Sequence, residues 1–177
     1  MKSDIPITNA LKFAWYGWFE WLMSWSLPPV RIFILRILGA RIGTGTVIMN
    51  CRFINTYHYG YRKLVIGNHC YIGDDALLDL RGGITLEDSV TIGNRVSIIS
   101  HMNVGFSDHP LQKIYPTSES VVLCKRGSYV ATAAVILPGV TIGKESAVAA
   151  GAVVTKSIPD HVMAAGVPAV VKKKLVL

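Results

Sequence analysis

The sequence has few charged residues and no long run of like charge. Aspartate, glutamate, lysine and arginine make up 16% of the 177 residues, whereas hydrophobic residues make up 51%. The net charge is +7, but the basic residues are scattered until residues 172–174, near the C-terminus. Proteins that bind nucleic acids usually have a concentrated basic patch. Since the basic residues here are scattered, we expect no nucleic-acid partner. A mildly basic surface suits small polyanions or an anionic membrane instead.

Cysteine is also scarce. The three cysteines, Cys51, Cys70 and Cys124, are an odd number with no spacing typical of a metal site or a disulfide framework. We expect them to be small buried hydrophobic residues in a reducing compartment. The prediction is therefore a cytoplasmic protein without metal ligands or a metal requirement.

A long uninterrupted apolar helix is missing as well. The most apolar stretch, residues 10–38, is interrupted by Lys12 and Glu20 and contains the Pro28–Pro29 pair, so it is a poor spanning helix. It also lacks the basic start and the small-residue cleavage site of a secretory signal. We expect neither a transmembrane anchor nor a secretory leader in these residues.

What the sequence has in their place is a repeat of six residues. Apolar residues recur at Ile66, Ile72, Leu78, Leu86, Ile92 and Ile98, and again at Cys124, Val130, Ile136, Ile142, Val148 and Val154. Small residues such as Ala76 and Ala152 follow most of them four positions later. Six is the period of neither a helix nor a strand, but it is typical of a solenoid in which each hexad makes one short strand and one corner. We predict an all-β parallel β-helix with three hexads per coil and a filled interior.

The repeat is broken at two places, and chemistry-bearing residues stand at both. Residues 103–121 do not follow the register, His101 comes just before them and His109 lies within them. A shorter disturbance at residues 81–83 follows Asp79. A long insertion in a compact coil is usually functional, so we expect one protruding loop that carries or borders the active site.

Three runs make a family resemblance specific: ILPGVTIG at residues 136–143, AAGAVVTKSIP at residues 149–159 and AAGVPA at residues 164–169. With the six-residue repeat, they resemble the hexapeptide-repeat acetyltransferases, closest to the maltose and galactoside O-acetyltransferase type and to enzymes that acetylate surface polysaccharides. The resemblance covers about residues 40 to 174. It implies a left-handed coil, against the usual right-handed rule for parallel crossovers, and a homotrimer with acetyl-coenzyme A bound between subunits.

The resemblance also implies catalytic residues. A saccharide hydroxyl is a poor nucleophile until a base removes its proton, and histidine titrates near neutral pH. His101, which the coil would fix rigidly, is our first candidate for this base, and His109 is the competitor; one could serve as base and the other as a substrate contact. Asp79 matches an aspartate that binds the acceptor or orients the histidine, although a corner aspartate also satisfies backbone N–H groups.

For acetyl-coenzyme A, the resemblance implies contacts in the C-terminal coils. The expected cofactor-binding residues are Tyr129, where relatives have tryptophan, and Thr132, Ala150, Thr155, Lys156 and Lys173. Lysines suit a phosphorylated nucleotide. A solvated tail remains the alternative interpretation of the lysines.

The N-terminal residues 1–38 lie outside the resemblance and form a helical, tryptophan-rich segment, followed by the β-helix of residues 39–174. Trp15, Trp18 and Trp25 fall on one helical face. Two readings stay open. The segment covers the open end of the solenoid or packs against another subunit, or it rests on the inner face of a membrane with Arg31 and Arg36 near the headgroups.

We therefore predict an acetyl-coenzyme A-dependent O-acetyltransferase that acts on a saccharide in cell-surface polysaccharide biosynthesis. An N-acetyltransferase acting on an amino sugar uses the same loop chemistry and is the main alternative. A γ-type carbonic anhydrase, which needs three histidine ligands around one metal ion, and a non-catalytic β-helix scaffold are the remaining ones.

Overall fold

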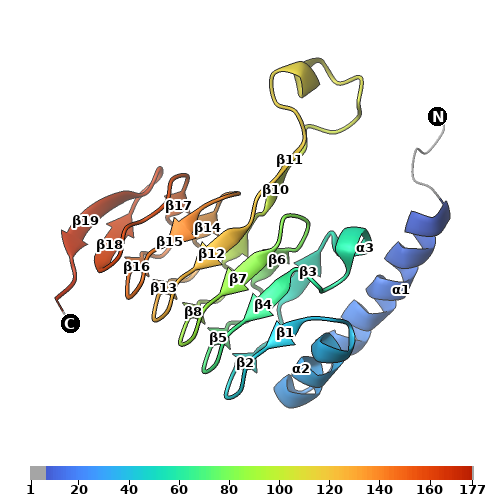
Figure 1. Ribbon diagram of the computed structural model, residues 1–177, viewed down its shortest axis with the longest axis horizontal. Helices are drawn as coiled ribbons and strands as arrows, with labels where there is room; N and C mark the ends of the chain where they lie inside the picture. Colours follow the sequence, from blue (N-terminus) through green and yellow to red (C-terminus); the bar gives the residue numbers. More distant parts are fainter. Residues whose placement is uncertain (1–6, 177) are drawn as a thin grey trace.

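The chain winds into a solenoid of short strands whose parallel pairs form three faces (Figure 1). The computed structural model describes residues 7–176. Face A contains β1 (Arg41–Ile42), β4 (Leu64–Ile66), β7 (Ile84–Leu86), β12 (Val122–Cys124) and β15 (Thr141–Ile142). Face B contains β2 (Val47–Ile48), β5 (Tyr71–Ile72), β8 (Thr91–Ile92), β13 (Tyr129–Val130), β16 (Ala147–Val148), β18 (Val162–Ala165) and β19 (Val170–Lys174). Face C contains β3 (Arg52–Ile54), β6 (Leu77–Asp79), β9 (Ser97–Ile98), β14 (Val135–Ile136) and β17 (Val153–Val154).

The six-residue repeat correctly predicts the interior. All twelve apolar repeat residues, from Ile66 to Val154, are buried, and Ala76 and Ala152 are buried with them. Cys51, Cys70 and Cys124 are buried, as expected. One strand residue points inward and the next outward, so the packed interior depends on the register of pairing between coils.

That register shows where the coil is interrupted. Leu123 pairs with Thr141, eighteen residues later, which is one coil of three undisturbed hexads. Earlier coils are longer: Leu64 pairs with Ile84, and Ile84 pairs with Val122. The extra residues of every long coil lie between a face C strand and the next face A strand. We call this edge of the solenoid the C–A corner.

The remaining corners are tight and regular. Asp75, Ser89, Arg95 and Glu145 have φ angles between 52° and 58°, in the left-handed region that turns the chain. Gly67 serves a different purpose, because a Cβ atom there would lie 2.7 Å from the backbone nitrogen of Asp88 in the next coil. Close stacking of coils therefore requires glycine at this position.

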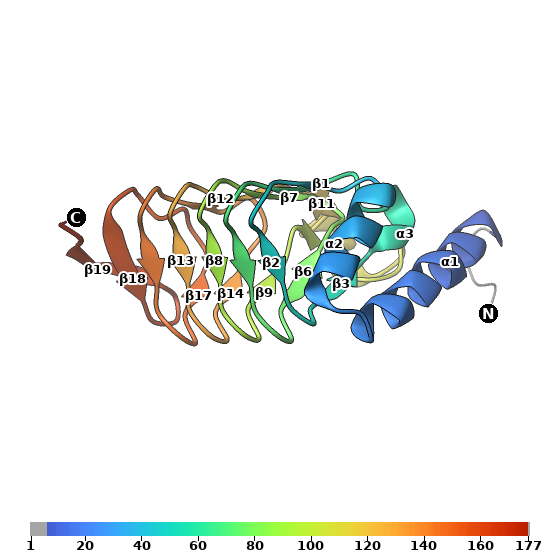
Figure 2. The ribbon, with the colours of Figure 1, turned by 90° about the horizontal axis from the view of Figure 1, so that it is seen from below.

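Two helices lie at the N-terminal end of the solenoid, α2 (Pro28–Ile37) against the coil and α1 (Ile7–Ser24) extending beyond it (Figure 2). Met23 of α1 and Leu35 of α2 belong to the buried core, so both helices are packed against the coil. Within residues 7–176, no helix has both the length and the hydropathy needed to cross a bilayer.

Arg31 fastens this helical end to the coil. Its guanidinium is buried and donates to the carbonyl oxygens of Met23 and Ser26 and, at 2.8 Å, to that of Ile48 in β2. These bonds satisfy a cation removed from water, and the carbonyl of Met23 belongs to the negative C-terminal end of α1. The expectation that Arg31 lies near lipid headgroups is therefore wrong. Arg36 is exposed, but it too is bonded to backbone carbonyls, those of Ile42 and Gly43.

Candidate active site at one corner of the coil

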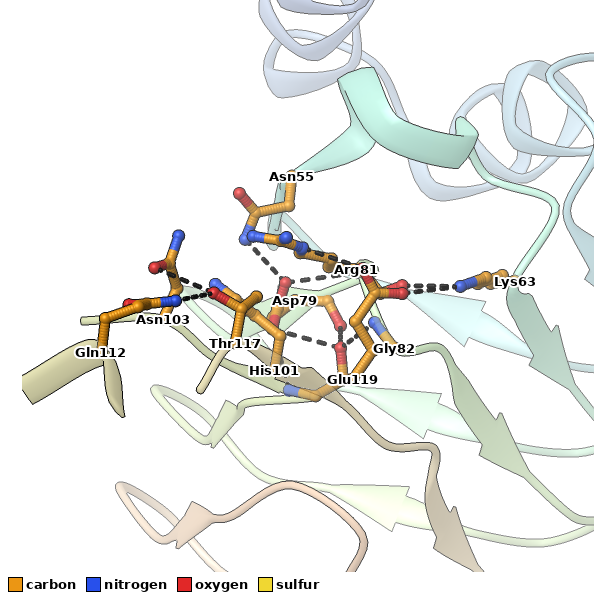
Figure 3. A network of polar contacts seen from close by, with 11 residues as sticks. Asn55, Lys63, Asp79, Arg81, Gly82, His101, Asn103, Gln112, Thr117 and Glu119 are labelled. Atoms are coloured by element: carbon orange, nitrogen blue, oxygen red, sulfur yellow. Dashed lines mark hydrogen bonds and ion pairs between the residues drawn. The ribbon is translucent and has the colours of Figure 1, made fainter. Parts of the chain in front are cut away.

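Three polar side chains from successive coils meet at the C–A corner (Figure 3). Asn55 follows β3, Asp79 ends β6, and His101 begins β10 (His101–Met102), just after β9. Asp79 Oδ1 accepts a hydrogen bond of 2.7 Å from Asn55 Nδ2. Asp79 Oδ2 lies 2.5 Å from Nδ1 of His101. Stacked coils therefore place an amide, a carboxylate and an imidazole in one line.

Asp79 is fully buried, yet its carboxylate is well satisfied. Besides Asn55 and His101, it accepts from the backbone N–H of Ser100 at 2.8 Å and from that of Arg81 at 3.2 Å. Burial raises the pKa of the Asp79 carboxyl, but these hydrogen bonds outweigh burial and hold its pKa below the usual value. Asp79 is therefore a charged acceptor at neutral pH.

An ionised Asp79 fixes the tautomer of His101. A carboxylate can only accept, so the neutral imidazole must carry its proton on Nδ1 and keep a lone pair on Nε2. The His101 side chain is 18% exposed, so the ring is held by the coil and still reached from the surface. A base with this arrangement can take a proton from a bound hydroxyl.

The base of the protruding segment fixes the backbone around His101. β10 pairs antiparallel with β11 (Ser118–Glu119), and the N–H of Ser120 donates to the carbonyl of Ser100. The N–H of Gly82 donates to Ser100 Oγ at 2.8 Å. A Cβ atom on Gly82 would collide with the carbonyl oxygen of Ser100. The irregular residues 81–83, which follow Asp79, thus pack against the backbone of the segment that begins at His101.

Charged side chains lie next to the Asp79–His101 pair. Glu119 lies opposite His101 in the β10–β11 ladder and pairs with Arg81 at 3.0 Å and Lys63 at 3.3 Å. Lys63 Nζ also donates to the carbonyl of Arg81 and lies 3.5 Å from the centre of the Tyr59 ring. These contacts connect the loop base to helix α3 (Thr56–Tyr59), which follows Asn55.

His109 lies elsewhere. Residues 103–117 extend away from the coils, and the short 3₁₀ helix η1 (Pro110–Lys113) lies near their tip (Figure 1). His109 is exposed and precedes this turn, and its Nδ1 accepts from the backbone N–H of Leu111 at 3.1 Å. The structure therefore brings together Asp79 and His101, but not His109.

The residues expected to bind the cofactor are spread over the prism. Tyr129 in β13 and Lys173 in β19 project from face B, and both are exposed. Thr132 and Ala150 lie in the turns between faces B and C. Thr155 and Lys156 follow β17 of face C and are exposed. No single surface of one chain gathers all six.

Three residues of the site could not be recognised from the repeat. Asn55, Lys63 and Glu119 have no repeat position, although Asn55 precedes Asp79 by the same twenty-four residues that separate Val47 from its partner Tyr71 in β5. That spacing was the available signal. Among residues 7–176, no three histidine, cysteine, aspartate or glutamate side chains are grouped as metal ligands.

Fold and site together define a hexapeptide-repeat solenoid with a histidine–aspartate pair where the repeat breaks. No family model matches the chain. It is 34% identical over 173 residues to "Putative colanic acid biosynthesis acetyltransferase WcaF" of Escherichia coli, covering 95% of this chain and 90% of that one. It is 29% identical over 158 residues to the galactoside O-acetyltransferase of Lactococcus lactis, covering 86% and 71%.

Among solved structures, a galactoside acetyltransferase in complex with coenzyme A aligns with a TM-score of 0.82 and 25% identity, over 98% of this chain and 86% of that chain. A hexapeptide-repeat acetyltransferase from Vibrio cholerae, complexed with acetyl-coenzyme A, has a TM-score of 0.78 at 23% identity, over 99% and 91%, and supports the fold. The chain belongs to the hexapeptide-repeat acetyltransferases. The family resemblance of the sequence is thereby confirmed, and the protein is an acyltransferase.

Proposed function

We propose that this protein transfers the acetyl group of acetyl-coenzyme A to a hydroxyl group of a saccharide, with His101 as general base. The observation that carries the proposal is the contact between buried Asp79 and His101. The named activities of the relatives, colanic acid biosynthesis and galactoside O-acetylation, favour a saccharide acceptor.

In the proposed reaction, His101 Nε2 takes the proton of the acceptor hydroxyl as its oxygen bonds to the carbonyl carbon of the acetyl thioester. Asp79 keeps the ring oriented and stabilises the imidazolium that forms. The carbon–sulfur bond breaks, and His101 returns the proton to the leaving thiolate. The products are an acetyl ester and coenzyme A, so atoms and charge balance.

The chain also has residues that suit the coenzyme. Lys156 and Lys173 are exposed cations that fit its phosphates. Thr132 and Ala150 are small residues at a corner, where a flexible arm can lie against the coil. Because the six expected residues lie on different sides of one prism, a single coenzyme can contact them all only between two copies. We therefore propose a trimer of left-handed β-helices with the coenzyme between subunits.

Residues 103–121 complete the acceptor site in this arrangement. Only the base of this segment is fixed to the coil, and its tip lies away from it. His109, which lies in the tip, is then a contact to the acceptor or to the neighbouring subunit. We assign the role of general base to His101, because Asp79 orients its imidazole ring.

Exposed aromatic residues of α1 and α2 suit a membrane surface. Trp15, Trp18, Trp21 and Trp25 are 54–81% exposed, and Phe33 of α2 is 64% exposed. Tryptophan-rich surfaces are typical of helices that lie in the interface of a bilayer. We propose that α1 and α2 rest on a membrane surface and that the acceptor is a saccharide assembled there for the cell surface.

Vesicle flotation tests this location. The Trp21→Ser/Trp25→Ser variant should lose most of its binding to anionic vesicles, whereas Phe106→Ser, which removes an exposed aromatic residue of the loop, should keep it. Equal flotation of both variants and the wild type would contradict the proposed membrane location.

The activity is tested by release of free thiol from acetyl-coenzyme A with a panel of neutral saccharides, acidic saccharides and amino sugars. We expect release that depends on a saccharide, and a product heavier by one acetyl group that mild base removes, as an ester requires. A base-stable amide formed only with amino sugars would replace O-transfer by N-transfer. Absence of turnover with every acceptor would contradict the proposed function.

A further inference from the structure

A cavity of about 390 Å³ lies beside the active-site corner, between α1 and α3. It is lined by Lys12, Tyr16, Tyr57, His58, Tyr59, Gly60, Arg62 and Lys63. Three of these residues are cations and three are tyrosines, and no carboxylate is among them. Such a lining combines apolar faces with a positive charge.

Hydrogen bonds and an ion pair connect the cavity to the catalytic pair. Lys63 bonds to the carbonyl of Arg81 and to Glu119, and Glu119 lies opposite His101 in the β10–β11 ladder. Helix α3 begins one residue after Asn55, which bonds to Asp79. The cavity and the proposed base therefore belong to the same corner.

The cations of the cavity are not equivalent. Lys63 is committed to Glu119 and the Arg81 carbonyl, and it covers the Tyr59 ring. Lys12 and Arg62 are exposed, and neither forms an ion pair with a residue of the described range 7–176. These two side chains are the ones available to an incoming anion.

His58 supplies a second observation. Its Nε2 is enclosed and has no hydrogen-bond partner among the described residues, although buried polar atoms are nearly always paired. Its ring lies against Tyr57, with 4.2 Å between ring centres. Burial and the nearby Arg81 cation lower the pKa of His58, so this ring is neutral beside the cations. A neutral His58 adds no charge to the lining, so Lys12 and Arg62 decide which ligands the cavity suits.

We infer that this cavity is an acceptor subsite for a saccharide that carries an anionic group, a carboxylate or a phosphate. Lys12 and Arg62 bind the anion, and the tyrosine rings contact the sugar. Guanidinium and ammonium groups are the usual partners of both anions, and a tyrosine ring offers an apolar face with a polar edge. The inference rests on the proposed function, because it assigns a chemical class to the acceptor of the same active site.

Binding without acetyl donor tests the subsite directly. Titration calorimetry would compare methyl glucuronide, galactose 1-phosphate and uncharged methyl galactoside. We expect at least one charged sugar to bind about ten-fold or more tighter than the neutral one, since a charge-assisted hydrogen bond contributes about 1.5–3 kcal/mol. Preference for the uronate would indicate an acidic polymer, and preference for the phosphate would indicate a sugar linked through phosphate. Equal affinity for charged and uncharged sugars would overturn the inference.

The Lys12→Gln/Arg62→Gln variant should lose this preference, whereas Arg95→Gln, an arginine at a corner between faces B and C, should retain it. In turnover, the double variant should raise KM for charged acceptors and leave kcat nearly unchanged. Titration with coenzyme A alone is the matched control. A ten-fold loss of coenzyme A affinity in the double variant would assign these cations to the nucleotide and refute the subsite. If no acceptor is acetylated but the charge preference persists, the proposed function fails, and the cavity is a binding site for an anionic sugar without being an acceptor subsite.

Discussion

The C–A corner and the corner between faces A and B are built on the same six-residue repeat, yet they differ in content. The A–B corner turns with short segments such as residues 67–70 and 143–146 in coil after coil. The C–A corner carries α3, the disturbance after Asp79 and the protruding loop. Asn55, Asp79 and His101 all lie there. Regular coils thus form a rigid support, while the departures from regularity carry the polar side chains of the candidate site.

The largest expected effect comes from the imidazole at the irregular corner. His101→Ala should lower kcat/KM about 100-fold or more, because a positioned general base contributes 10²–10⁴-fold. His109→Ala, which alters the exposed loop, should cost less than about ten-fold. Steady-state thiol release measures both, with circular dichroism to verify folding. A fully active His101→Ala enzyme would contradict the assignment, as would an equal loss in both variants.

Asp79→Asn should reduce both activity and stability. It removes the charged acceptor of His101 and weakens a buried network, at a cost of about 1–3 kcal/mol at neutral pH. The folded pKa of Asp79 lies below its unfolded value, so its contribution is complete above about pH 4 and is lost as pH falls through the folded pKa. Urea unfolding at several pH values should show the wild-type advantage shrinking in acid. An advantage that does not change with pH would refute this account of Asp79.

Two glycine substitutions compare the corners directly. In Gly82→Ala the new Cβ meets the carbonyl of Ser100, and in Gly143→Ala it meets the carbonyl of Pro159. Overpacking should cost each variant about 1–3 kcal/mol of unfolding free energy. Only Gly82→Ala should also lower kcat, because the backbone of Ser100 leads into His101. Equal kcat in both variants at a temperature where both are folded would weaken the distinction between the corners.

The smallest effect is expected at the helical end. Burial raises the pKa of Glu20 from 4.5 to about 7, and its carboxyl group is bonded to the Tyr61 hydroxyl and the Phe53 N–H. Since the unfolded chain gives up this proton more readily, the wild type loses stability as pH rises from about 4.5 to 7. Glu20→Gln should flatten that part of the pH–stability curve, unlike Asp108→Asn in the loop. An unchanged pH dependence would show that the surroundings of Glu20 do not raise its pKa in solution.

The interior of the fold could be predicted from the sequence because each hexad repeats the same physical demand. Ile92 and Val130 are buried for the same reason, so one pattern found both. Asp79 and His101 could be selected as candidates because each stands where that pattern stops, and their catalytic role stays a prediction. Lys63 could not be predicted, since no repeat places it beside Asp79, and for Asn55 the only signal was the twenty-four-residue spacing of the first coil.

For the N-terminal segment, the sequence indicates the amphipathic helix but not the burial of Arg31. Its tryptophans show that the segment is amphipathic, but a helical pattern does not say which basic residues remain accessible. Arg31 was expected near the headgroups and is buried, because its carbonyl partners come from α1 and β2. Such partners are brought together only by tertiary packing.

Arg31 also sets how firmly α1 is attached. A guanidinium stays protonated at any physiological pH, so the link from α1 through Met23 to the coil does not respond to acidity. Glu20 lies almost one turn earlier in the same helix and does titrate in that range. Helix α1 is thus held at its C-terminal end by the hydrogen bonds of Arg31, which do not depend on pH. Just before them it is held by the hydrogen bonds of Glu20, which do.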